Sequence, residues 1–126
     1  MKTFQSINDF LNEIGIKTNR QNNNFYIFRI EDHFGESGFE MPPYNHSFFE
    51  LTFGIGHDVG INIGTAKFNT TSNVLSFTSP YQITSWKVNS FADNSIGFML
   101  LFNPAFVETA IALLLGLNAI AMFGQD

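Results

Sequence analysis

The fold is decided by one stretch of the sequence, Pro42-Pro43-Tyr44-Asn45-His46-Ser47-Phe48-Phe49-Glu50-Leu51-Thr52-Phe53-Gly54-Ile55. It is rich in aromatic and β-branched residues, begins with two prolines and is followed by glycines, so it predicts a central β-strand. Side chains alternate between the two faces of a strand, which divides this one into a mixed face and an apolar face. The mixed face consists of His46, Phe48, Glu50 and Thr52, and the apolar face of Phe49, Leu51 and Phe53. We expect the mixed face to line the interior of a small barrel, where a ligand or metal would lie.

The composition is typical of one globular domain. A chain of 126 residues with 16 phenylalanines and 13% charged residues can bury an aromatic core. The net charge of −5, with only six basic residues, argues against direct nucleic-acid contact and against a polybasic membrane anchor. The sequence has no cysteine, which excludes disulfides, thiolate metal sites and cysteine nucleophiles. We expect a cytoplasmic protein, because the first residues do not resemble a signal peptide.

The remaining sequence predicts a short helix followed by several strands. Ser6 is a candidate N-cap with Asp9 three residues later, and apolar residues follow at helical spacing up to Gly15. The strands are predicted at residues 25–30, 59–63, 65–68, 74–78, 83–88 and 96–102, the last of them buried on both sides. Turns or loops are predicted at residues 32–38, at Gly54, Gly56, Gly60 and Gly64, and at residues 91–94. Short strands at regular spacing indicate a sandwich or a small barrel.

The last stretch, residues 105–123, has a composition that favours a helix. Its run of about fourteen apolar residues is shorter than the roughly twenty needed to cross a bilayer, so we expect no membrane span. A helix that is apolar on all sides must be covered, and we expect a second copy to cover it in a homodimer. An altered reading frame is the alternative origin of such a tail. The candidate dimerisation residues are Phe106, Ile111, Leu114, Leu115 and Ile120.

Four segments carry a family resemblance: residues 25–32, 42–50, 75–86 and 97–106. In this order and spacing they resemble the N-terminal regulatory domain of AraC-type transcription regulators, which is a cupin fold. The resemblance implies a mainly β fold, a double-stranded β-helix or jelly-roll barrel, that senses a small molecule and dimerises. It divides a single domain of residues 1–126 into a helix and lead-in (1–24), the cupin-like barrel (25–104) and a C-terminal apolar helix (105–126).

The sequence departs from the family in two respects. AraC-type regulators usually continue into two helix-turn-helix units, and this sequence ends at Asp126 without them, so we expect no direct DNA contact by this chain. The general cupin metal motif offers two histidines and a glutamate on one strand and a later histidine. Here His46 and Glu50 match, while Tyr44 and Thr84 stand at the two other histidine positions and Tyr81 replaces the turn glycine. Because a catalytic metal keeps at least three protein ligands, we expect no metal cofactor.

The residues expected to hold a small-molecule effector are Tyr44, His46, Phe48, Glu50, Tyr81, Thr84 and Trp86. Aromatic walls with a few polar groups are typical of small-molecule sites. Ordinary core packing is the alternative for the aromatic residues, and a mutual hydrogen bond is the alternative for His46 and Glu50. His33 and His57, beside Asp32 and Asp58, are predicted to lie on the surface.

Three functions remain open on the sequence. The first is a metal-free sensor domain that binds an effector and dimerises but is not an enzyme. The second is a small metal-dependent cupin enzyme, an isomerase, epimerase or dioxygenase, in which His46 and Glu50 take part in the chemistry. The third is a regulator remnant without a ligand. No nucleophilic catalytic motif is present, since the sequence lacks cysteine and a Gly-x-Ser-x-Gly segment.

Overall fold

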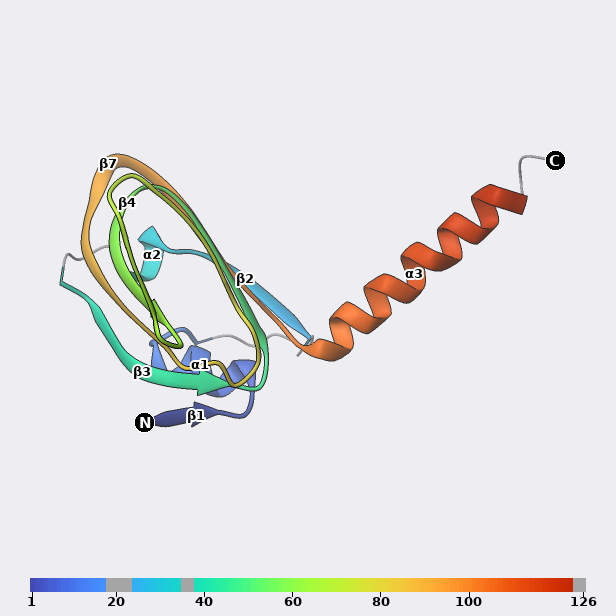
Figure 1. Ribbon diagram of the computed structural model, residues 1–126, viewed down its shortest axis with the longest axis horizontal. Coiled ribbons are helices and arrows are strands. Elements are labelled where there is room, and N and C mark those ends of the chain that lie inside the picture. The colour runs from blue at the N-terminus through green and yellow to red at the C-terminus, as the bar shows by residue number, and fades with distance from the viewer. Residues whose placement is uncertain (18–23, 35–37, 124–126) are drawn as a thin grey trace.

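The computed structural model describes residues 1–17, 24–34 and 38–123, with side chains described up to Gly116 (Figure 1). The elements in chain order are β1 (Lys2–Phe4), α1 (Ile7–Glu13), β2 (Phe25–Arg29), α2 (Glu31–Phe34), β3 (Glu40–His46), β4 (Phe49–Ile63), β5 (Ala66–Thr70), β6 (Asn73–Thr78), β7 (Thr84–Phe102) and α3 (Pro104–Phe123). The predicted fold class, mainly β with a short helix near the N-terminus and a helix at the C-terminus, is confirmed.

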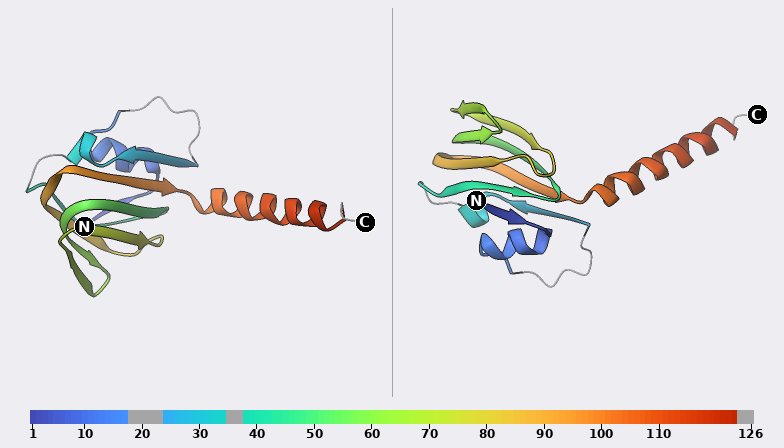
Figure 2. Two further views of the ribbon diagram at one scale, coloured as in Figure 1. Left: turned by 90° about the horizontal axis from the view of Figure 1, so that it is seen from above. Right: turned by 60° about the horizontal axis from the view of Figure 1, so that its bottom comes forward.

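Two long antiparallel strands, β4 and β7, organise the sheet, whose strand order is β1-β3-β7-β4-β5. The end of β4 pairs with the start of β7, from Val59↔Val88 to Ile63↔Thr84, and β3, β1 and β5 extend this first layer. The start of β4 pairs with the end of β7, and β2 and β6 extend this second layer. Both long strands bend between the layers, so the sheet folds over on itself (Figures 1 and 2).

The bend in β4 lies at two register shifts, one between Ile55 and His57 and one between Asp58 and Val59. Gly56, inside the first shift, has φ +77°, a conformation that glycine adopts without strain. A β-bulge bends its strand, so this pair of shifts carries β4 from one layer into the other. The glycines predicted to mark turns therefore lie within a continuous strand, and only Gly64 (φ +59°) lies in the predicted hairpin between β4 and β5.

Several local predictions are confirmed. Ser6 caps α1, because its Oγ accepts a hydrogen bond from the Asp9 amide at 3.1 Å. Strands form at β2 and β6 as expected, and α3 covers the predicted C-terminal helix.

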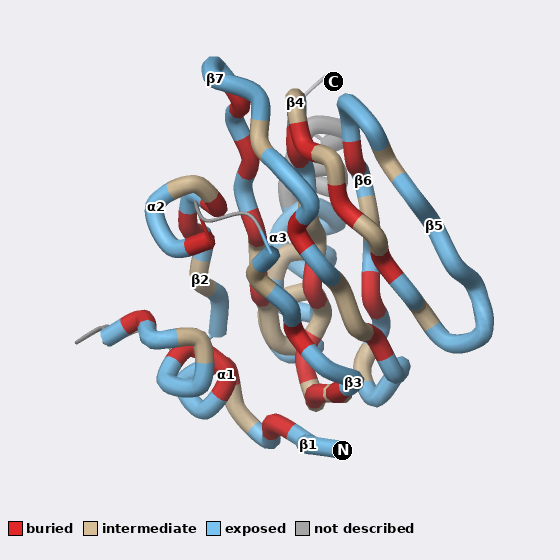
Figure 3. The backbone as a smooth tube through the Cα atoms, turned by 90° about the vertical axis from the view of Figure 1, so that its left-hand side faces the viewer, coloured by how far each residue is buried: buried red, intermediate tan, exposed pale blue. Residues whose placement is uncertain are grey.

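Other local predictions are wrong. The predicted central strand is broken at Ser47 and Phe48 into β3 and β4. Residues 91–94, predicted as a turn, lie inside β7, and the predicted loop at 32–38 begins in α2, with residues 35–37 outside the described part. Residues 96–102 alternate between buried and exposed and are not buried on both sides (Figure 3). Alternation along both long strands leaves one face of each layer outward.

The core lies between the two layers and under α1. One cluster joins α1 to the end of the sandwich, where the Phe10 ring lies 5.5 Å from Tyr44 and 5.9 Å from Phe48. A second, smaller cluster consists of Val59, Ile61, Val74 and Val88. Trp86, which is partly buried, packs against both clusters and so connects them.

Candidate functional site

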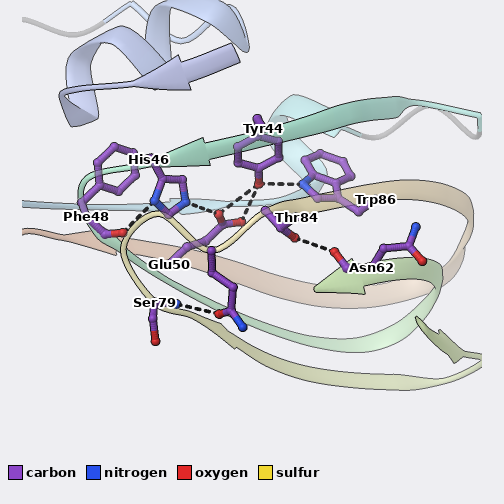
Figure 4. Close-up of polar contacts among 9 residues, drawn as sticks. Tyr44, His46, Phe48, Glu50, Asn62, Ser79, Thr84 and Trp86 are labelled. Atoms are coloured by element: carbon purple, nitrogen blue, oxygen red, sulfur yellow. Dashed lines mark hydrogen bonds and ion pairs between the residues drawn. The ribbon is translucent and has the colours of Figure 1, made fainter. Parts of the chain in front are cut away.

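Four of the predicted site residues form one buried hydrogen-bonded network (Figure 4). Trp86 Nε1 donates to the Tyr44 hydroxyl at 3.1 Å, and that hydroxyl donates to the Glu50 carboxylate at 3.0 and 3.2 Å. His46 Nε2 lies 2.8 Å from Glu50 Oε2. The residues come from three strands, β3, β4 and β7, so tertiary structure and not sequence proximity brings Trp86 to Tyr44.

The alternation along β3 and β4 explains why these side chains meet. His46 and Glu50 flank the Ser47-Phe48 break, and the chain reversal there places both side chains on the inner face. The mixed face predicted from the sequence therefore does face inward, although the single strand that carried the prediction is two strands. Phe48 is fully buried and stacks on the His46 ring, with centroids 4.0 Å apart and an interplanar angle of 6°.

Both nitrogens of His46 are engaged. Nδ1 lies 2.6 Å from the Phe48 carbonyl oxygen, which only accepts, so Nδ1 carries a hydrogen. Nε2 and the Glu50 carboxylate then hold one proton between them at 2.8 Å. The hydroxyl of Tyr44 donates to both Glu50 oxygens from the other side. The alternative in which His46 and Glu50 hydrogen-bond to each other is thus the one that the structure shows.

The Tyr44 hydroxyl is held in its neutral form. Burial, and next the negative charge of Glu50, raise the pKa of Tyr44 well above its usual value, while the hydrogen bond from Trp86 works in the opposite direction. A neutral phenol can accept from Trp86 and donate to Glu50 at the same time. The network is therefore satisfied internally, which a buried charge requires.

This donor set does not fit a catalytic metal. Neither nitrogen of His46 has a free lone pair, because Nδ1 donates to a carbonyl and Nε2 faces Glu50. Tyr44 donates to Glu50, and Thr84 uses its hydroxyl on the Asn62 carbonyl at 3.0 Å. Across residues 1–17, 24–34 and 38–123, no three histidine, aspartate or glutamate side chains converge on a common point. A metal centre needs at least three such ligands.

Thr84 and Tyr81 have different positions. Thr84 is buried in β7 and lines the interior beside Trp86. Tyr81, expected among the effector-binding residues, does not line the inner cavity: its side chain is 55% exposed, and the residue (φ +65°) lies in the turn after β6. What Tyr81 contributes is its amide, which donates to the His46 carbonyl at 2.7 Å.

A second buried pair, His57 and Glu31, was missed by the sequence analysis. His57 was predicted on the surface beside Asp58, yet it is 1% exposed, and its Nε2 lies 2.6 Å from Glu31 Oε1. His33 is exposed, as predicted. The available signal was the pair of glycines at Gly54 and Gly97, which face each other across β4 and β7 and leave space for the His57 ring.

Glu31 gathers four hydrogen bonds at the start of α2. Besides His57, its carboxylate accepts from Ser95 Oγ, the Gly97 amide and Arg29 Nε, each at 3.2 Å. Burial works to raise the pKa of Glu31, but the hydrogen bonds from His57, the backbone and Arg29 outweigh it and the pKa is lowered. Glu31 is therefore ionised at neutral pH and fixes the inward-facing ring of His57.

The space between the layers is mostly filled. A cavity of about 40 Å³ remains, with room for about three water molecules. Its wall is largely apolar, and its polar lining residues are Glu50, Thr52, His57, Ser76, Thr78 and Thr84. The two histidine–glutamate pairs thus both reach this cavity, through Glu50 and through His57.

A larger cleft of about 520 Å³ lies between β5 and β6. Among the described strands, β5 and β6 each pair with β4 and not with each other, so the two layers separate along this edge. Ile61, Val74 and Ser76 line both the cleft and the inner cavity. The cleft falls within the range of about 300–1,000 Å³ that small-molecule sites occupy.

Comparisons with known proteins give no family assignment. No family model matches the sequence, and no curated protein matches it. The chain is similar in structure to a cupin 2 conserved barrel domain protein from Rhodopseudomonas palustris, with 15% identity, coverage of 70% of this chain and 57% of that chain, and a TM-score of 0.46. It is also similar to a predicted oxalate decarboxylase from Thermotoga maritima, with 12% identity, coverage of 63% and 64%, and a TM-score of 0.44. The chain thus spans less than two thirds of either structure, and neither similarity bears on its function.

Proposed function

We propose that the chain is a binding domain that admits a small uncharged or cationic organic effector through the cleft between β5 and β6. In this it resembles the sensory half of an AraC-type regulator, a domain that binds an effector and self-associates without touching DNA itself. The observation that carries the proposal is the 520 Å³ cleft itself, whose lining residues Ile61, Val74 and Ser76 also line the inner cavity.

The lining defines the class of effector. Apolar residues dominate the inner wall, and the free polar groups are mainly hydroxyls: Thr52, Ser76 and Thr78. Glu50 also lines the inner cavity, and its carboxylate disfavours an anion. A short aliphatic alcohol or amine matches this combination, because it has an apolar body and one hydrogen-bond donor.

Binding is favoured over catalysis by the state of the acid–base groups. General acid–base catalysis needs a side chain that can exchange a proton with the substrate. His46, Glu50 and Tyr44 instead hydrogen-bond to one another and to Trp86. We therefore propose a domain that is not an enzyme, in preference to the metal-dependent isomerase, epimerase or dioxygenase.

The single tryptophan makes the proposal testable by fluorescence. Trp86 lines the cavity, so an entering ligand should change its emission. We expect saturable changes with n-butanol and n-butylamine, accompanied by a rise in melting temperature, and none with sodium butyrate. The absence of saturable binding for both the alcohol and the amine would overturn the proposal and favour the remnant without a ligand.

A matched pair of variants locates the site. Ser76→Leu adds bulk at a residue that lines both the cleft and the cavity, whereas Ser90→Leu adds the same bulk at an exposed position of β7. We expect at least a tenfold loss of affinity for Ser76→Leu and no change for Ser90→Leu. Equal affinities in the two variants would place the ligand elsewhere. Circular dichroism confirms that both variants are folded.

A further inference from the structure

The outward side of the second layer is an unusually apolar surface, which we call the outer face. It consists of alternating residues from β2, β7, β4 and β6. Eight of its apolar side chains are at least 37% exposed: Phe25, Ile27, Phe53, Ile55, Leu75, Phe77, Ile96 and Phe98. At about 200 Å² for a large side chain, roughly half of it exposed, they present on the order of 800 Å². That exceeds the largest apolar patch of a typical monomer, about 300–600 Å², and equals the area that each partner buries in a standard interface.

The helix α3 is the second uncovered apolar element. It projects away from the body in every view (Figures 1 and 2). Ile111, Leu113, Leu114 and Leu115 are each at least 51% exposed. At 100° per residue these positions point to different sides of the helix, so pairing two such helices would still leave apolar side chains in water. A broader apolar surface is needed to cover α3.

We propose that α3 of a second copy packs across the outer face, each chain giving its helix to its partner. This inference rests on the self-association part of the proposed function and names the surface that is used. The helix is long enough to cross the whole face, because a 20-residue helix is about 30 Å long and four strands are about 19 Å wide.

The charges on the two surfaces are complementary. On the outer face the one charged residue is Arg29, and within α3 the one charged residue is Glu108. Both side chains are exposed. Arg29 already contacts Glu31 through Nε at 3.2 Å, but its side chain is 47% exposed, so its guanidinium can also attract Glu108 of a docked helix and set the orientation of docking.

The first turn of the chain's own helix contacts the end of its own outer face through Phe106, and the rest of the helix projects away from that face (Figures 1 and 2). Only Asn103 separates β7 from α3, and the Asn103 amide donates to the Asn24 carbonyl at 2.8 Å. The Phe106 ring then packs on Phe25 at 5.1 Å and on Phe102 at 6.3 Å, at the end of the sheet. These contacts fix the first turn of α3 in its outward direction, so the helix that covers the face comes from another molecule. No helix of the described residues has the length and hydropathy of a bilayer span.

The test measures the mass of the full chain by sedimentation at micromolar concentration. Phe53 on the outer face and Ile83 before β7 have similar exposure, 43% and 46%. We expect a dimer for the wild-type chain and for Ile83→Glu, and half that mass for Phe53→Glu with unchanged circular dichroism. A dimeric Phe53→Glu would overturn the inference while leaving self-association intact. A monomeric wild-type chain, including one that floats with phosphatidylcholine vesicles, would overturn both.

Disulfide trapping tests the contact directly, because the natural chain has no cysteine. Chains carrying Phe53→Cys and Leu114→Cys are co-expressed and oxidised, and we expect the mixed disulfide on a non-reducing gel. The control pair, Ile83→Cys with Leu114→Cys, should not cross-link. Disulfides between two Leu114→Cys chains alone would show helix pairing and contradict the inference. Ligand binding measured through Trp86 on the same samples keeps the failure of this inference distinct from failure of the effector proposal.

Discussion

The imidazole of His57 lies directly against the backbone of Gly97. A methyl group at Gly97 would overlap the ring carbon Cε1 and come within 2.8 Å of Nε2. Gly97 pairs with Gly54 across β7 and β4, and a methyl group there would overlap the same ring. Two facing glycines therefore make the slot in which a buried histidine lies between the layers.

The first prediction concerns that slot. Gly97→Ala should destabilise the fold by about 1–3 kcal/mol, because the ring is held by Glu31 and cannot move without losing that hydrogen bond. Chemical denaturation measures the effect. Gly116→Ala is the control, since nothing lies within 4 Å of a methyl group there, and alanine in a helix should stabilise by up to about 1 kcal/mol. An unchanged midpoint for Gly97→Ala would contradict the packing described.

A second prediction concerns the Tyr44 hydroxyl. Tyr44→Phe removes the acceptor of Trp86 and a donor to Glu50, and should cost about 1–3 kcal/mol of stability. The emission maximum of Trp86 should move to shorter wavelength, because its indole N–H loses a polar partner. Tyr81→Phe, at an exposed position, should change stability by less than about 0.5 kcal/mol. Identical behaviour of the two variants would disprove the network.

The lowered pKa of Glu31 gives a third prediction. Because the folded-state pKa lies below the value of 4.5 for the free side chain, the ionised group stabilises the folded state above pH 4.5. That contribution should be lost as the pH falls from 4.5 through the lower folded-state pKa. Between pH 7 and pH 3 the free energy of unfolding should change less with pH in Glu31→Gln than in the wild type. Asp93→Asn, at an exposed position, should retain the wild-type dependence.

A fourth prediction concerns metal ions. Since both nitrogens of His46 are engaged, adding Mn²⁺, Fe²⁺ or Zn²⁺, or removing metal with EDTA, should leave the melting temperature unchanged. His46→Ala should cost about 3–5 kcal/mol, because it leaves Glu50 buried without its partner. Elemental analysis is the check: a stoichiometric ion that disappears in His46→Ala would restore the enzyme hypothesis.

Local sequence patterns predicted the elements that depend on local chemistry. Examples are the Ser6 cap, the hairpin at Gly64 and the helix α3, each of which depends on residues that are close together in the sequence. Alternation along residues 46–53 also predicted which side chains face inward. The break between the two strands contains two residues, an even number, so the alternation continues in the same phase after it. His46 and Glu50 remained in phase across the Ser47-Phe48 break.

Features that depend on distant residues were not predictable in this way. Glycines usually mark turns, and in β4 they instead permit a bend and admit the His57 ring, which only the pairing with β7 reveals. Glu31, 26 residues from His57, gave no sign of being its partner. The apolar run at 96–102 predicts a strand buried on both sides. In the structure one face of its layer is exposed, and Ile96 and Phe98 lie on that face.

The continuity of β4 and β7 through both layers has a consequence for how this chain can vary. Inserting or deleting a single residue near the middle of either strand would invert the inward and outward positions of everything beyond it. Inward-facing hydroxyls and outward-facing phenylalanines would then exchange places together, as with Thr52 and Phe53, which are adjacent in the chain. Length changes should therefore be tolerated in the turn at Gly64 and scarcely at all within these two strands.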